Sequence, residues 1–274
     1  MNAILIILLV FIIFFLLMIF LIKPNRRRDY SAFTGKMFAH RGLHDETIPE
    51  NSISAFRLAV EHGYGVELDV QMTLDKQLVV FHDGSLKRMT GEDGYLRNYT
   101  YEQLQTLCLN KTEEKIPLLK DVLQVLGTTD LICEIKADNG NMNYELCKKT
   151  YDYLKEYKGI YCIESFSPYL VKWFRIHHPQ VIRGQLSCNM YSQEHMIFPV
   201  RFAMTHLLIN CISRPDFIAY RHKDTRQFGY ALCKALYRPL LFGWTARGEK
   251  EQASAKDKFD SLIFEQNEQE NPVE

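Results

Sequence analysis

The chain opens with one long apolar run. No residue from Ala3 to Ile22 is charged or strongly polar, and a helix of that length, rising about 1.5 Å per residue, spans about 30 Å, the hydrocarbon thickness of a bilayer. A cleaved signal peptide is the alternative, but no basic residue precedes the run and no small-residue cleavage site follows it. The pattern therefore predicts a membrane-spanning helix.

Beyond this run, short apolar stretches with strand spacing alternate with stretches of helical period. Helices are predicted between residues 52 and 63, over 118–126 and 144–157, and from Ser167-Pro168 to about His177. Strands are predicted at 37–40, 65–73, 78–81, 131–136, 160–165, 182–186, 217–220, 240–245 and 261–264. Counting the hairpin of 65–73 and 78–81 as one barrel strand gives the strand number of a (β/α)8 TIM barrel, an α/β fold.

Two segments depart from this alternation. Residues 83–115 are polar and contain a short helix that starts at a capping box of Thr100 and Gln103, so we expect an insertion at the barrel rim. Residues 195–212 are unusually apolar, and their plainest interpretation is a helix that covers a strand. The predicted organisation is a membrane anchor with a basic flank at 1–29, a barrel at 30–265 and an acidic, solvated tail at 266–274.

Overall composition changes this picture little. Basic and acidic residues balance at 33 each, so the chain lacks the basic excess of a nucleic-acid-binding protein. The seven cysteines show no CxxC pair and no metal-ligand spacing, which favours small buried side chains in a reducing compartment. An anionic substrate must therefore be recognised by a local site.

Basic residues flank the apolar run on one side only. Lys23, Arg26, Arg27 and Arg28 follow it, whereas the short stretch before it has no Lys or Arg. By the positive-inside rule, this distribution predicts a single-pass protein of the cell membrane with its catalytic domain in the cytoplasm.

Several predicted strands end in ionisable residues, which is where a barrel places its catalytic groups. In Glu67-Leu68-Asp69 and in Glu134-Ile135-Lys136 the ionisable residues stand two apart, so each pair points to one face of its strand. An exposed strand edge would explain either pair alone. Inward-facing carboxylates, however, need a neutralising cation, and Glu67, Asp69 and Glu134 are oxygen ligands of the kind that Mg²⁺ or Ca²⁺ prefers.

These residues belong to an ordered series of short motifs. The motifs are His40-Arg41-Gly42, Pro49-Glu50-Asn51-Ser52, Glu67-Leu68-Asp69-Val70, Thr73 with Asp75, His82-Asp83, Ile116-Pro117-Leu118 and Glu134-Ile135-Lys136, followed by the weaker Glu164-Ser165-Phe166 and Trp244-Thr245. Their order and spacing over about residues 37–264 resemble those of the glycerophosphodiester phosphodiesterase family. The resemblance implies the (β/α)8 barrel and a phosphodiesterase activity.

The resemblance also implies roles for individual residues. His40 and His82 would act as general acid and base, in an order that the sequence leaves open. Arg41 and Lys136 would contact the phosphate, and Glu50 would join the surrounding hydrogen-bond network. The residue matching Trp244 lines the substrate pocket in the family, although Trp244 could equally be barrel core. The implied metal ligands are Glu67, Asp69 and Glu134.

The implied reaction is metal-dependent hydrolysis of glycerophosphodiesters, or of related lipid-derived diesters, to a phosphomonoester and an alcohol. One alternative is a lysophospholipase D that acts on membrane lysophospholipids. An inactive, membrane-tethered binding barrel is a second alternative, but it would require the loss of a catalytic group, and every implied group is present. The headgroup, the choice between Mg²⁺ and Ca²⁺ and the oligomeric state stay open.

Two positions depart from the family pattern. After its last strand the family commonly has Thr-Asp followed closely by Pro, where this chain has Phe264-Glu265-Gln266. Arg247 stands where Asn or Asp is frequent. We also hypothesise that the apolar segment 195–212 dips into the membrane interface and shelters an acyl chain.

Overall fold

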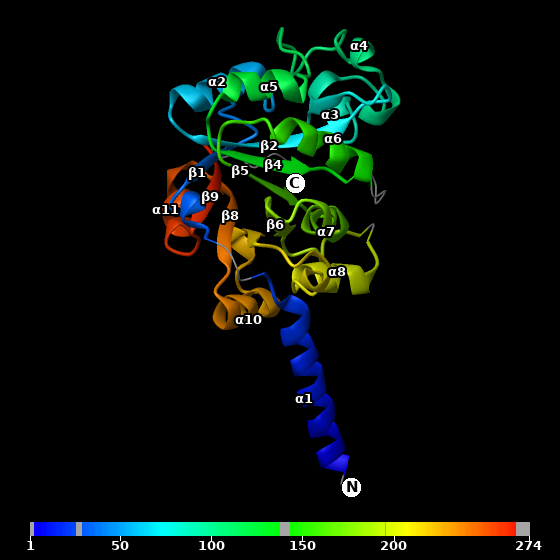
Figure 1. Ribbon diagram of the computed structural model, residues 1–274, viewed down its shortest axis with the longest axis vertical. Coiled ribbons are helices and arrows are strands. Elements are labelled where there is room, and N and C mark those ends of the chain that lie inside the picture. Colours follow the sequence, from blue (N-terminus) through cyan, green and yellow to red (C-terminus); the bar gives the residue numbers. More distant parts are fainter. Residues whose placement is uncertain (1–2, 26–28, 138–142, 195, 267–274) are drawn as a thin grey trace.

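The computed structural model describes residues 3–25, 29–137, 143–194 and 196–266. Arg26, Arg27 and Arg28 and nearly all of the predicted tail, 267–274, lie outside these ranges. Helix α1 (Ala3–Ile22) projects from one end of a closed barrel (Figure 1). Among the described residues it is the one helix with the length and hydropathy of a bilayer span, properties that a signal sequence would share.

The barrel is built from one sheet. Its strands are β1 (Met37–His40), β2 (Gly65–Met72), β3 (Leu78–Val80), β4 (Leu131–Ile135), β5 (Tyr161–Ser165), β6 (Ile182–Ser187), β7 (Phe217–Arg221), β8 (Leu240–Arg247) and β9 (Ser261–Glu265). Strand β1 pairs in parallel with both β9 and β2, so the sheet closes on itself. Strand β3 pairs antiparallel with the end of β2 as the predicted hairpin. The predicted (β/α)8 TIM barrel is confirmed.

Alternate residues of each strand face the barrel interior. Phe38 and Ile132 belong to the apolar cluster that fills it, whereas Cys133 packs in the layer shared with the helices. His40 and Glu134 stand two residues further along the interior faces of the same strands. The same alternation that points apolar side chains into the barrel interior therefore points charged side chains inward at the carboxyl ends of the strands.

Helices cover the outside of the sheet (Figure 1). They are α2 (Ile53–Glu61), α5 (Leu119–Leu126), α6 (Tyr144–Leu154), α7 (Pro168–His177), α8 (Phe198–Thr205), α9 (Asn210–Ser213), α10 (Phe228–Tyr237) and α11 (Gly248–Lys256). At the start of α2 the Ser52 hydroxyl accepts a hydrogen bond from the Ala55 N–H, and Asn143 caps α6 in the same way through the Leu146 N–H. Helix α6 ends at Leu154, three residues before the predicted position.

The polar segment after β3 forms the predicted insertion. It contains α3 (Lys87–Thr90), the 3-10 turn η2 (Leu96–Asn98) and α4 (Tyr101–Leu104), around a small core of its own that includes Leu86 and Leu96. The capping box of Thr100 and Gln103 is formed at the start of α4.

The apolar segment 196–212 holds two short helices, α8 and α9, where one helix was predicted. Between them Leu207 has a φ of 61°, a left-handed conformation that a continuing α-helix cannot contain. The side chain of Leu207 is fully buried. Because this buried position also requires an apolar residue, the apolar sequence pattern continues across the break between α8 and α9.

Candidate active site

The carboxyl ends of the strands surround a cavity of about 370 Å³. Asp69 and Glu50 lie next to it, with Asp69 Oδ1 3.1 Å from Lys136 Nζ and Glu50 Oε1 2.9 Å from Arg41 Nη1. The remaining predicted site residues all line the cavity, namely His40, Arg41, Glu67, His82, Glu134, Lys136 and Trp244. The structure thus brings the whole predicted set together from distant parts of the chain.

Glu67, Asp69 and Glu134 form a buried carboxylate cluster. One oxygen from each lies within 4.8 Å of the others, because Asp69 pairs with Glu134 in the register between β2 and β4. Burial, then the neighbouring carboxylates, raise the pKa of Glu67 well above its usual value, and burial raises the pKa of Glu134 to about 7. A divalent cation would remove this mutual repulsion, so the oxygen-only donor set fits Mg²⁺ or Ca²⁺.

One lysine offsets part of the cluster's charge. Lys136 Nζ lies 3.1 Å from Asp69 Oδ1 and 3.1 Å from Glu134 Oε1. Burial alone would raise the pKa of Asp69, but Lys136 and other nearby cationic groups hold it well below its usual range. Because Lys136 also lines the cavity, its ammonium group is in place to meet a phosphate.

His40, at the end of β1, is held by a carboxylate from the last strand. His40 Nδ1 lies 2.6 Å from Glu265 Oε1, and Arg247 Nε donates to Glu265 Oε2 at 2.8 Å. Burial opposes ionisation of Glu265, yet the contacts with His40 and Arg247 lower its pKa to about 2. Since an ionised carboxylate only accepts, His40 carries a proton on Nδ1 and presents Nε2 to the cavity.

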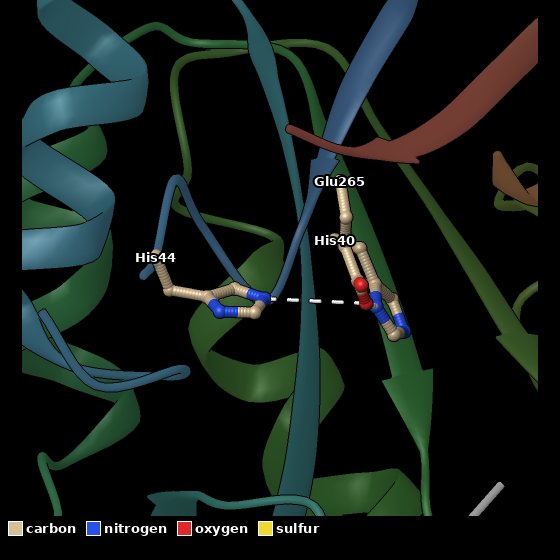
Figure 2. A group of neighbouring side chains, drawn as sticks. All are labelled: His40, His44 and Glu265. Carbon is tan, nitrogen blue, oxygen red and sulfur yellow. Dashed lines mark hydrogen bonds and ion pairs between the residues drawn. The ribbon is translucent and has the colours of Figure 1, made fainter. Parts of the chain in front are cut away.

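His44 lies on the other side of the same carboxylate. Its Nε2 is 4.0 Å from Glu265 Oε1, and Figure 2 shows the two histidines on either side of Glu265. The three groups are close enough to hold a metal ion. Arg247, however, already supplies a positive charge to this carboxylate, so His40, His44 and Glu265 make a poorer metal site than the three carboxylates.

His82 follows β3 and is held in the same way as His40. Its Nδ1 lies 2.7 Å from Asp83 Oδ1, so its Nε2 is also available to the cavity. Burial, then the positive charges of Lys136 and Arg41, lower the pKa of His82 to about 4. The ring is therefore neutral near pH 7.

An ion-pair network supports Arg41 and His82. Arg88 Nη2 lies 2.6 Å from Glu50 Oε1 and Arg88 Nε lies 2.7 Å from Asp83 Oδ2. Burial would raise the pKa of Glu50, but Arg41 and Arg88 hold it well below its usual range. Glu50 thus links Arg41 to the Asp83 that orients His82. No motif pointed to Arg88, because it comes from the insertion.

The turn after β1 aims Arg41 into the site. Arg41 has a φ of 55° and Gly42 a φ of 81°. A Cβ at residue 42 would lie 2.8 Å from the backbone of Ala55, so only glycine fits there. The turn brings the Arg41 N–H to 3.1 Å from Glu67 Oε2, where it donates a hydrogen bond to a predicted metal ligand.

Hydrophobic side chains form part of the cavity lining, here called the apolar wall, although Asn189, Ser192 and Gln193 also line the cavity from the same part of the chain. Trp244 packs edge-to-face on Phe166 with 5.6 Å between ring centroids. The wall is completed by Cys188, Met190, Met196 and Met204. Methionine side chains adapt to irregular apolar groups, so this wall suits the organic part of a substrate, while the histidines and cations face its charged part.

The sequence alone did not reveal the part played by Glu265 and Arg247. Both stood out only as departures from the family pattern, and the structure shows that the two departures contact each other and His40. Both residues lie far from His40 in the sequence, so the contact could not be recognised from a local motif. Glu164, a weak landmark in the sequence, also lines the cavity, and burial raises its pKa well above the usual value.

Fold and site together define a phosphoric diester hydrolase built on a TIM barrel. Residues 40–222 match the model of the glycerophosphoryl diester phosphodiesterase family. The chain belongs to this family.

Relatives and solved structures agree with this assignment. The chain is 33% identical over 173 residues, 58% of its length, to a glycerophosphodiester phosphodiesterase of Caldanaerobacter subterraneus subsp. tengcongensis, of which the match covers 70%. It is 31% identical over 160 residues, 46% of its length, to the lysophospholipase D GDPD1 of Homo sapiens, of which the match covers 51%. Its fold is similar to that of an Oleispira antarctica phosphodiesterase solved with sn-glycerol-3-phosphate, with a TM-score of 0.69 and 22% identity, covering 85% of this chain and 94% of the other.

Proposed function

We propose that this enzyme hydrolyses glycerophosphodiesters to a phosphomonoester and an alcohol, with a divalent metal ion, Mg²⁺ or Ca²⁺, bound by Glu67, Asp69 and Glu134. One observation carries the proposal: two histidines and three carboxylates from the ends of β1, β2, β3 and β4 meet at or beside one cavity. When bound, the ion would offset the charge of the phosphate and make it open to attack.

The protein's own residues supply the proton transfers. His40 and His82 are both held through Nδ1, so each offers Nε2 to the substrate. One Nε2 takes the proton of the attacking water, and the other histidine, which starts the step as an imidazolium, gives its Nε2 proton to the leaving alcohol oxygen. Arg41 and Lys136 bind the phosphate oxygens, and Trp244 contacts the organic group.

A substrate panel tests this function. Full-length protein, purified in detergent, is assayed with deacylated glycerophosphodiesters and with lysophospholipids, and the phosphomonoester product is identified. We expect turnover of at least one class with release of the headgroup alcohol. A correctly folded, metal-loaded protein that releases no phosphomonoester from any diester would contradict the proposal.

A lysophospholipase D activity is the second candidate. The methionine-rich wall of the cavity favours it, since this wall could accept the start of an acyl chain beside the phosphate site. The human and rodent relatives named lysophospholipase D GDPD1 also support it. The same substrate panel separates the two candidates.

We further propose that residues 1–29 anchor the 30–265 barrel to the cell membrane as a single-pass protein, with the barrel in the cytoplasm. The apolar helix α1 and the cations that follow it support this topology. Cysteine labelling on intact cells is the test, with Cys108 and Cys211 as the more accessible thiols of the described chain. Their reaction with a membrane-impermeant reagent would reverse the topology.

A further inference from the structure

The end of α1 is fixed to the barrel by hydrogen bonds. The last carbonyl groups of a helix have no partner within the helix and need donors from elsewhere. Here the barrel supplies side-chain donors from α9, its C-terminal flank and α10. The bonds run from Tyr237 Oη to Ile19 O (2.8 Å), from Arg214 Nη1 to Phe20 O (3.0 Å) and Lys23 O (2.7 Å), and from Asn210 Nδ2 to Ile22 O (2.8 Å).

Apolar packing and the following residues add to this attachment. Met18 and Ile22 are buried, whereas most of α1 is exposed. The Arg214 guanidinium stacks over the Phe20 ring at 4.8 Å from its centroid. Beyond the helix, Asn25 N donates to Pro215 O at 2.7 Å. The first residues after the helix are therefore part of the barrel surface, and the barrel has one orientation relative to α1.

This orientation brings α8 to the end of the barrel from which α1 emerges. Figure 1 shows α8 and α10 at that end, with α2 and α4 at the opposite end of the long axis. The start of α8 presents apolar side chains to the outside: Ile197 is 68% exposed, Phe198 59% and Val200 38%. Met196 and Met204, on the other side of the same segment, line the cavity.

We propose that Ile197, Phe198 and Val200, here called the α8 patch, lie in the interfacial layer of the bilayer that α1 crosses. The proposal rests on the membrane anchoring proposed above. Short segments with an exposed apolar face insert at the boundary between headgroups and acyl chains. Helix α1 is attached at the same end of the barrel as the α8 patch. A bilayer crossed by α1 therefore lies next to this patch. A single segment then separates lipid from the apolar wall of the cavity, so a single-chain lipid diester reaches the metal site without leaving the interface.

Depth-dependent fluorescence quenching tests the position of the patch. Full-length protein carrying Phe198→Trp is reconstituted in phosphatidylcholine vesicles whose acyl chains are brominated, and its emission is read against the unsubstituted chain, which has two tryptophans. We expect the added emission to be quenched. Leu74→Trp is the control, since Leu74 is 60% exposed and its N–H donates to Tyr99 O beside α4, at the far end. Its emission should stay unquenched.

A second pair of variants tests the attachment of α1. Arg214→Asn, in the Phe198→Trp protein, removes the bonds to Phe20 O and Lys23 O, and Asn tolerates the φ of 43° at this position. We expect most of the quenching to be lost while the protein stays in the vesicles. Arg238→Asn is the matched control, with the same change at a φ of 44° after α10, and should leave quenching unchanged.

Turnover of a water-soluble glycerophosphodiester is measured on every sample. Active protein with unquenched Phe198→Trp emission would overturn the inference and leave the proposed function standing. Quenching that appears only when the protein is diluted in the vesicles would show that a second copy of the chain covers the patch, and it would overturn the inference. An inactive but quenched protein would keep the inference and count against the proposed function.

Discussion

Glu265 fixes which nitrogen of His40 faces the cavity. The carboxylate holds the proton on Nδ1, and Arg247 in turn holds the carboxylate ionised. Both residues are buried, so neither is available for a role at the surface. The family commonly has Thr-Asp after its last strand and Asn or Asp at the position of Arg247, whereas in this chain Glu265 and Arg247 pair with each other. This pair keeps a negative charge behind the imidazole.

We expect Glu265→Gln to lower kcat by about tenfold or more, in the range found for residues that orient a functional ligand. The amide has nearly the same shape but no charge to orient and stabilise the imidazole. Glu251→Gln is the control, because Glu251 also accepts a hydrogen bond from Arg247, through the backbone N–H, but does not touch His40. KM should change little in both variants. A rise in KM for Glu265→Gln with an unchanged kcat would contradict this positioning role.

The lowered pKa of Glu265 predicts a pH-dependent contribution to stability. Its pKa falls from the usual 4.5 to about 2 on folding, so the ionised carboxylate stabilises the fold at pH values above 4.5. This stabilisation is lost as the pH falls from 4.5 toward 2. The difference in Tm between wild type and Glu265→Gln should therefore be largest near neutral pH and shrink in acid. A constant difference across that range would show that the charge is not involved.

We expect His40→Ala and His82→Ala each to abolish turnover with the fold intact. Each change removes a proton-transfer group from the cavity wall without opening the apolar core, and such losses are typically about 10²- to 10⁴-fold. His62→Ala, at an exposed position at the end of α2, is a matched control. Near wild-type kcat in either active-site variant, with a native far-UV circular dichroism spectrum, would refute the acid–base assignment.

At the scale of elements, strand register explains why the site could be predicted. His40 pairs with Glu67 between β1 and β2, and Asp69 pairs with Glu134 between β2 and β4. Parallel register and inward alternation are enough to bring such groups together once the strands are recognised. The contribution of Arg88 could not be predicted, since the insertion follows no barrel periodicity. The break at Leu207 was also hidden, because its apolar side chain continues the helical pattern.

The carboxylate cluster at these strand ends predicts metal-dependent activity. Chelation should abolish turnover, and Mg²⁺ or Ca²⁺ should restore it, because Glu67, Asp69 and Glu134 would otherwise repel each other and the phosphate. Glu134→Gln should weaken metal affinity, which calorimetric titration of the ion measures directly. The exposed Glu113→Gln serves as its control. Full activity in excess EDTA, after verified metal removal, would exclude the ion from the reaction.

At the scale of the whole molecule, hydrogen bonds and apolar packing join the barrel to helix α1. The sequence predicted both parts but left their relation open, since donors such as Tyr237 and Asn210 lie about two hundred residues from α1 in the chain. The barrel residues that bind the end of α1 follow no hydrophobic period, so the sequence pattern could not reveal this contact. For a barrel anchored as proposed, the attachment decides which side of the barrel meets the bilayer.

This geometry gives the last prediction, which concerns the source of the substrate. A water-soluble diester gains nothing from an anchored enzyme, whereas a lipid in the same bilayer meets a site held at its own surface. Removing residues 1–29 should therefore depress turnover of vesicle-borne lysophospholipid far more than turnover of a soluble glycerophosphodiester. The soluble substrate is the internal control, because deletion of α1 uncovers Asn210 and Cys233 and would lower both rates equally if it only destabilised the barrel. Equal losses, or no lysophospholipid cleavage by the full chain, would leave α1 with a targeting role alone.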